Sequence, residues 1–93
     1  MEIIHEKNDR KGAFVAKDED RKAGEMTYSQ AGTDKIIIDH TEVNPEFKGK
    51  GVGKELVYAA VDYAREHQLK IMPLCPFAKA TFDKNPDIQD VLF

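Results

Sequence analysis

Residues 1–43 carry short apolar runs separated by polar, turn-forming stretches. Brief apolar runs bounded by turn residues are typical of β-strands. We predict four strands here, in the segments MEIIHEK, GAFVAKD, AGEMTYSQ and KIIIDHTEV. Asn8, Asp9, Gly12 and the acidic run 18–20 supply turns between the first three segments, and AGTD supplies the turn before the fourth. The pattern predicts an antiparallel meander.

The fourth segment, residues 35–43, has the density of β-branched residues expected of a central strand. Successive side chains of a strand point to opposite faces, so its residues divide into two sets. One face is predicted to carry Ile36, Ile38, His40 and Glu42, and the other Ile37, Asp39, Thr41 and Val43. Asn44 and Pro45 end the strand.

The apolar period changes from two residues to that of a helix between Gly51 and about His67. The segment LKIMPLC then predicts another strand, and Pro73 within it favours a sheet edge, a bulge or a parting of strands. A short helix over FAKATFDKN and one further apolar turn follow. A strand, loop, helix and strand in succession predict a parallel crossover between neighbouring strands. The fold class is therefore α+β (α/β), with a mostly antiparallel sheet and one such crossover.

Composition narrows the class of protein. The chain has 93 residues, 41% of them hydrophobic and 33% charged, which indicates one globular domain over 1–93. A net charge of −3 argues against a broad nucleic-acid surface. The single cysteine excludes an internal disulfide, and we find neither a membrane span nor a signal sequence. We expect a cytoplasmic monomer without a nucleic-acid or membrane partner. The histidines show no metal-binding spacing, and His5 and His67 are expected at the surface.

The stretch NPEFKGKGVGKELV places glycines and lysines directly before the predicted helix. No Ser, Thr, Asp or Asn precedes Val52 to cap the helix, so the exposed N–H groups of its first turn favour an anion such as phosphate. The stretch does not fit a Walker A loop, which needs Gly where this chain has Lys48 and Ser or Thr where it has Glu55. It does not fit the G-x-G-x-x-G of a dinucleotide fold either. A flexible basic turn is the alternative.

The segment KGKGVGKELV resembles the R/Q-x-x-G-x-G/A motif of the GCN5-related N-acetyltransferases, with Lys48 in the Arg/Gln position and Gly51 and Gly53 in the small positions. The chain from Ile36 to Phe82, including HTEV and PLCPFA, is similar to the small single-domain branch of that family. The resemblance implies acetyl-coenzyme A, or coenzyme A, as the cofactor, with its pyrophosphate on the amides of the loop.

The resemblance also implies a set of cofactor-binding residues. Backbone groups of the strand end would pair with the pantetheine arm, the alternative being ordinary sheet pairing. The glycines would let the backbone approach the pyrophosphate, and the lysines would screen its charge, unless they form only a solvated basic rim. The residues implied are Thr41, Glu42, Val43, Lys48, Gly49, Lys50, Gly51, Val52, Gly53 and Lys54.

Two residues are candidates for catalysis. A lone cysteine is often a small buried hydrophobe, but the resemblance places Cys75 close to the acetyl thioester, as a nucleophile. His40 is either a packed strand residue or the base for Cys75, because the crossover makes their strands neighbours. Tyr58 and Tyr63 are interpreted as packing residues, and Tyr28 has no assigned role.

The function expected from this resemblance is acetyl transfer to an unidentified amine, by direct attack on the thioester or through acetyl-Cys75. Two alternatives stay open. One is a coenzyme A-binding module without transferase activity. The other is an interaction domain whose basic loop meets a phosphorylated or acidic partner.

Overall fold

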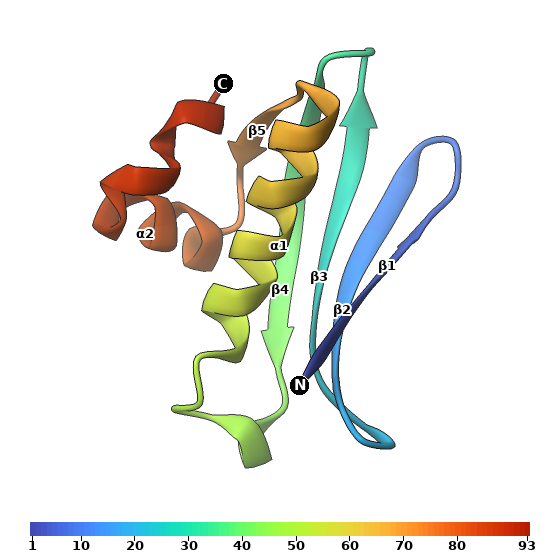
Figure 1. The fold of residues 1–93 in the computed structure, drawn as a ribbon, viewed down its shortest axis with the longest axis vertical. Coiled ribbons are helices and arrows are strands. Elements are labelled where there is room, and N and C mark those ends of the chain that lie inside the picture. Colours follow the sequence, from blue (N-terminus) through green and yellow to red (C-terminus); the bar gives the residue numbers. More distant parts are fainter.

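A computed structural model describes all residues, 1–93. Its strands form one sheet in the order β1-β2-β3-β4-β5, with bounds Glu2–Lys7, Lys11–Asp18, Arg21–Ala31, Lys35–Val43 and Lys70–Pro73 (Figure 1). The helices are α1 (Val52–His67) and α2 (Pro76–Lys84), and the short 3-10 helices are η1 (Pro45–Phe47) and η2 (Pro86–Val91). No helix is long and apolar enough to cross a membrane.

The predicted topology is confirmed. Strands β1 to β4 pair antiparallel in chain order, and β5 pairs parallel with β4, from Lys35 opposite Lys70 to Ile38 opposite Pro73. Strand β5 ends the sheet and stops at Pro73, whose ring nitrogen has no hydrogen to donate. The crossover through α1 is the α+β arrangement that the residue pattern predicts.

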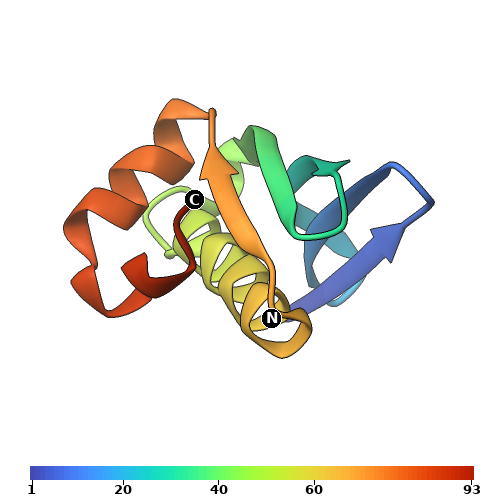
Figure 2. The same ribbon diagram turned by 90° about the horizontal axis from the view of Figure 1, so that it is seen from above.

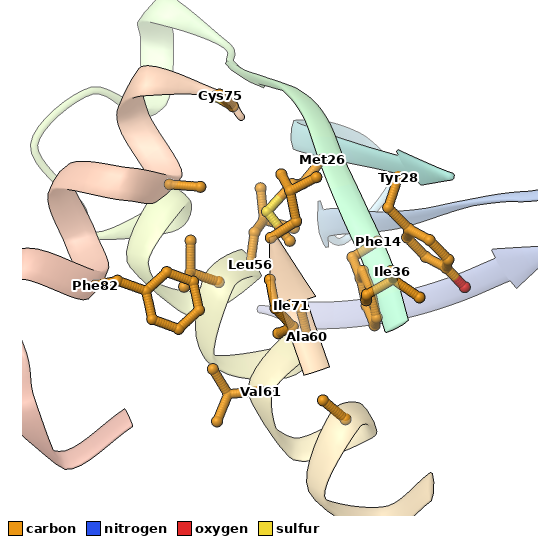
Figure 3. Packing of buried hydrophobic residues seen from close by; sticks show 14 of the residues in the cluster. Phe14, Met26, Tyr28, Ile36, Leu56, Ala60, Val61, Ile71, Cys75 and Phe82 are labelled. Atoms are coloured by element: carbon orange, nitrogen blue, oxygen red, sulfur yellow. The ribbon is translucent and has the colours of Figure 1, made fainter. Parts of the chain in front are cut away.

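Helix α1 covers one face of the sheet, here called the helix face (Figure 2). Its buried stripe recurs at helical spacing, and Leu56, Ala60 and Ala64 are fully buried. These residues meet Met26 and Ile71 of the sheet in one hydrophobic cluster (Figure 3). The small alanines let the helix backbone approach the strands closely, and α2 and η2 pack beside α1.

The alternation predicted along β4 is wrong beyond Ile38. Thr27 of β3 lies opposite His40, but the next residue, Tyr28, lies opposite Ile38, so Asp39 is an extra residue in the ladder. Such a β-bulge reverses which side chains face the core. Thr41 therefore shares the helix face with Ile38, whereas His40 is exposed and pairs with Thr27 on the opposite face.

An aromatic cluster joins β1 to the C-terminal part of α1, and it corrects the surface position expected for His5. The His5 ring stacks on Phe14 with centroids 4.3 Å apart and meets Tyr63 edge-on at 4.5 Å. His5 Nε2 lies 2.5 Å from the Tyr28 hydroxyl. Burial, Lys7 and His67 lower the pKa of His5 below 6.5, and burial with the neighbouring Tyr63 raises the pKa of Tyr28 to about 12. His67 is exposed, as expected.

The lowered pKa of His5 predicts acid sensitivity. Neutral His5 stabilises the fold fully above the unfolded value of 6.5, and this stabilisation is lost as pH falls through the lower folded pKa. The melting temperature of the parent should therefore be lower at about pH 5 than at about pH 7.5. His5→Phe, which keeps the ring stack, should show a smaller fall. Tyr28→Phe should keep the parent's fall, because burial is the main cause of the shift. Equal falls in His5→Phe and the parent would assign the sensitivity to other groups.

Candidate functional site

The glycine loop connects η1 to α1 through left-handed backbone. Asn44 begins η1 by accepting a hydrogen bond from the Glu46 amide at its side-chain oxygen, 3.0 Å away. Gly49 has φ +83° and Gly51 has φ +76°, and no atom lies within 4 Å of a Cβ added to either residue. Their conformation is one that only glycine adopts without strain. The positive φ angles of these two residues require glycine. The absence of side chains also leaves the backbone of the loop accessible.

The first turn of α1 offers unpaired N–H groups at this loop. Gly51 is the N-cap and supplies no side chain, as the sequence predicts. The first backbone hydrogen bond of the helix runs from the Glu55 amide to the Gly51 carbonyl, at 3.0 Å. The amides of residues 52–54 therefore have no backbone acceptor. These amides and the positive end of the helix dipole form a potential anion site.

Three lysines surround these amides, and all are exposed. None of Lys48, Lys50 and Lys54 forms an ion pair with a carboxylate. The Lys50 Nζ lies over the Phe47 ring at 5.5 Å and the Lys54 Nζ over the Tyr58 ring at 5.5 Å. Their positive charge is therefore available to a ligand at the loop.

A cavity of about 580 Å³ connects the loop to the end of β4. Its lining combines backbone of the loop with apolar side chains. The lining residues are Thr41, Val43, Pro45, Phe47, Lys48, Gly49, Gly51, Val52, Gly53, Lys54 and Phe77. Strand β5 stops pairing with β4 at Ile38, so residues 39–43 have a strand partner only on the β3 side. The cavity thus lies beside an open strand edge, which an extended ligand could pair with.

Gly53 differs from the other loop glycines, because a side chain approaches it. A Cβ added at Gly53 would lie 2.2 Å from Cζ of Phe77, in the first turn of α2. Phe77 is 43% exposed. Sequence patterns did not single out Phe77, since nothing local shows that α2 begins against α1.

Cys75 lies at the opposite end of the site, as the N-cap of α2. It is 5% exposed, and its Sγ donates a hydrogen bond to Thr41 Oγ1 at 3.4 Å. Burial opposes ionisation of the thiol, but hydrogen bonds from Thr41 and from the amides at the start of α2 outweigh burial and lower the pKa of Cys75. The Cys75 and Leu74 amides both bond the Ile38 carbonyl, at 3.2 and 3.1 Å, which fixes Cys75 where the two strands part.

The predicted site residues divide between the two faces of the sheet. Cys75 and Thr41 meet on the helix face, but no hydrogen bond joins Cys75 to His40, which lies on the opposite face because of the bulge. The expectation of a Cys–His pair assumed unbroken alternation along β4. Glu42 is also exposed and lies opposite Glu25. The roles of His40 in catalysis and of Glu42 in cofactor binding stay predictions.

The family model for the GCN5-related N-acetyltransferases matches residues 13–91. The fold has the features of these acyl-transferring enzymes. It combines a five-stranded sheet that contains a parallel β4–β5 pair, a crossover helix that follows a basic glycine loop, and a cavity where those two strands part. This chain belongs to the GCN5-related N-acetyltransferase family.

Two solved structures resemble the fold. A GCN5-like protein from Staphylococcus aureus superposes with a TM-score of 0.72 at 39% identity, covering 97% of this chain and 87% of its own. A Bacillus anthracis protein solved in complex with acetyl coenzyme A has a TM-score of 0.64 at 20% identity, over 83% of this chain and 47% of its own. The latter likeness concerns the fold alone.

The chain is also similar to Protein NATD1 of Xenopus tropicalis. The two are 33% identical over 61 residues, which are 66% of this chain and 56% of the relative. The chain thus spans little more than half the length of this curated relative.

The contact between Cys75 and Thr41 predicts how the thiol titrates. Thr41→Val keeps the side-chain shape but removes the hydroxyl that can donate to the thiolate, so the pKa of Cys75 should rise. Alkylation by iodoacetamide should then be slower than in the parent at neutral pH and equally fast at alkaline pH. Thr27→Val is the matched control, since Thr27 lies on the opposite face. An unchanged pH profile in Thr41→Val would contradict the role of this hydroxyl.

Proposed function

We propose that this protein is an acetyl-coenzyme A-dependent N-acetyltransferase acting on an amine. The observation that carries the proposal is the continuity of one cavity. It runs from the unpaired amides and lysines of residues 48–54 to Thr41, whose hydroxyl contacts Cys75. Its two ends match two parts of an acyl-coenzyme A, the anionic pyrophosphate and the electrophilic thioester at the far end of the pantetheine arm.

The residues present fit this substrate. The loop amides and Lys48, Lys50 and Lys54 would hold the pyrophosphate, because they combine donors with uncompensated positive charge. The open edge of β4 at 41–43 would pair with the amides of the pantetheine arm. The B. anthracis protein bound to acetyl coenzyme A supports this choice through its shared fold.

Acetyl transfer would follow one of two balanced routes. In the first, an uncharged amine attacks the thioester carbonyl carbon, the bond to the coenzyme A sulfur breaks, and the amine proton passes to solvent. In the second, the Cys75 thiolate attacks that carbon and displaces the coenzyme A thiolate. The amine then attacks acetyl-Cys75, the bond to the Cys75 sulfur breaks to release its thiolate, and the amine proton passes to solvent. The lowered pKa of Cys75 favours the second route, since the thiolate is the attacking species.

The cysteine route predicts a covalent adduct. Incubation with acetyl-coenzyme A should add one acetyl group to Cys75, seen by mass spectrometry and removed by hydroxylamine. Cys75→Ala should keep the affinity for acetyl-coenzyme A, because the thiol lies at the end of the site away from the lysines, but should lose the adduct and most transfer to a panel of amines. Transfer at the parent's rate by Cys75→Ala, without any adduct in the parent, would leave direct attack as the mechanism.

The lysines predict a salt-dependent affinity. Lys48→Ala, Lys50→Ala and Lys54→Ala should each weaken binding of coenzyme A by a few-fold at low salt and by less at about 0.5 M salt, because exposed charges are screened. Calorimetric titration measures these affinities. Lys84→Ala, in the last turn of α2, is the control and should bind as the parent does. A parent that binds no coenzyme A at all would leave the interaction-domain alternative.

A further inference from the structure

We propose that Phe77, seated on Gly53, forms the apolar wall that receives the pantetheine arm between the loop and Cys75. This inference rests on the proposed function, because it assigns the middle of the same site. Gly53 is interpreted through the family motif as a residue that lets the backbone approach the pyrophosphate. The structure gives it a different neighbour.

The first step concerns why residue 53 has no side chain. A Cβ there would lie 2.2 Å from Cζ and 2.4 Å from Cε2 of Phe77, closer than real contacts allow. Gly49 and Gly51, by contrast, have no atom within 4 Å of an added Cβ and are required by their positive φ. Gly53 is a buried residue in the first turn of α1 and has no positive φ. With the Phe77 ring in this position, residue 53 has no room for a side chain.

The second step concerns what Phe77 does there. The Phe77 ring is 43% exposed, and it lines the cavity together with Thr41 and Val43. Phe77 follows Cys75 by two residues, and Pro76 fixes the backbone between them at the start of α2. A ligand that reaches from the lysines to Cys75 passes the exposed part of this ring.

The third step concerns the chemistry that fits the wall. The lining changes from lysines and free amides at the loop to Val43, Phe47 and Phe77 farther in. The pyrophosphate suits the first part, and the largely apolar arm suits the second. Burial of the exposed ring by the arm would contribute binding energy that a ligand without the arm cannot gain.

The seat can be tested without any ligand. Melting temperatures are measured for the parent, Gly53→Ala, Phe77→Ala and the double variant, as a double-mutant cycle. Alanine is a better helix former than glycine, so Gly53→Ala should raise the melting temperature in the Phe77→Ala background. With Phe77 present, the gain should be absent or reversed. The same effect in both backgrounds would overturn the seat.

The wall is tested with two probes, acetyl-coenzyme A and adenosine 3′,5′-bisphosphate, which lacks the arm. Phe77→Ala should weaken acetyl-coenzyme A binding about tenfold, as expected for loss of a large apolar contact. The affinity for the bisphosphate should change by less than about twofold. Leu74→Ala is the matched control, since Leu74 is 63% exposed beside Cys75 but does not line the cavity. An equal loss for both probes, or no loss for either, would overturn the wall.

The two proposals fail in different ways. A parent protein that does not bind acetyl-coenzyme A would refute the proposed function, whereas the melting temperatures would still decide whether Phe77 sits on Gly53. If the parent binds acetyl-coenzyme A and Gly53→Ala weakens that binding equally with and without Phe77, this inference is overturned. Gly53 would then be a residue that lets the backbone approach the pyrophosphate.

Discussion

The extra residue in β4 determines which side chains can reach the site. Asp39 has no residue opposite it in the β3 ladder, and from that point the strand presents Thr41 and Val43 to the helix face in place of His40 and Glu42. Beyond the same point β5 no longer pairs with β4, because its chain turns into α2 after Pro73. The open edge of β4, the Thr41 hydroxyl and the start of α2 therefore lie together. Without the bulge, Thr41 could not contact Cys75.

The starts of two helices meet at this place, and each contributes in a different way. Helix α1 begins with free amides and no capping side chain, so its positive end is directed at the cavity. Helix α2 begins at Cys75, where burial raises the pKa of the thiol and the Thr41 hydroxyl and the amides of the helix's first turn lower it. The contact between Gly53 and Phe77 holds the two starts together. One helix thus presents free amides to the cavity, and the other places its thiol against Thr41, which lines that cavity.

The edges of the sheet are stabilised far from the cavity. At β5 the chain's last residues close the edge, since the Phe93 amide bonds the Ile71 carbonyl at 3.0 Å. Arg65 of α1 binds Asp90 at 2.7 Å and so holds η2 against the helix. At β1, His5 lies between Phe14 and Tyr63. The Tyr28 ring packs directly on Gly12, where a Cβ would lie 2.3 Å from Tyr28 Cζ. The rigid scaffold keeps β4 and α1 in fixed positions.

Local patterns in the sequence determined the elements of this fold. Apolar runs of strand length, the helical period after Gly51 and Pro73 at the sheet edge predicted the meander and the parallel crossover, because each depends on neighbouring residues. The uncapped, basic start of α1 was predictable for the same reason. The place of Cys75 near the thioester came from the family resemblance instead, and it stays a prediction.

Only the tertiary structure decided the partners across the site. Whether Asp39 is bulged depends on its register with β3, and a shift of one residue moved His40 away from Cys75 and brought Thr41 to it. Phe77 and Gly53 are distant in sequence and meet because α1 and α2 start side by side. His5 became part of a half-buried aromatic cluster through its pairing with Phe14. Contacts of this kind depend on how elements that are distant in sequence pack against each other. The spacing of residues within one element does not predict that packing.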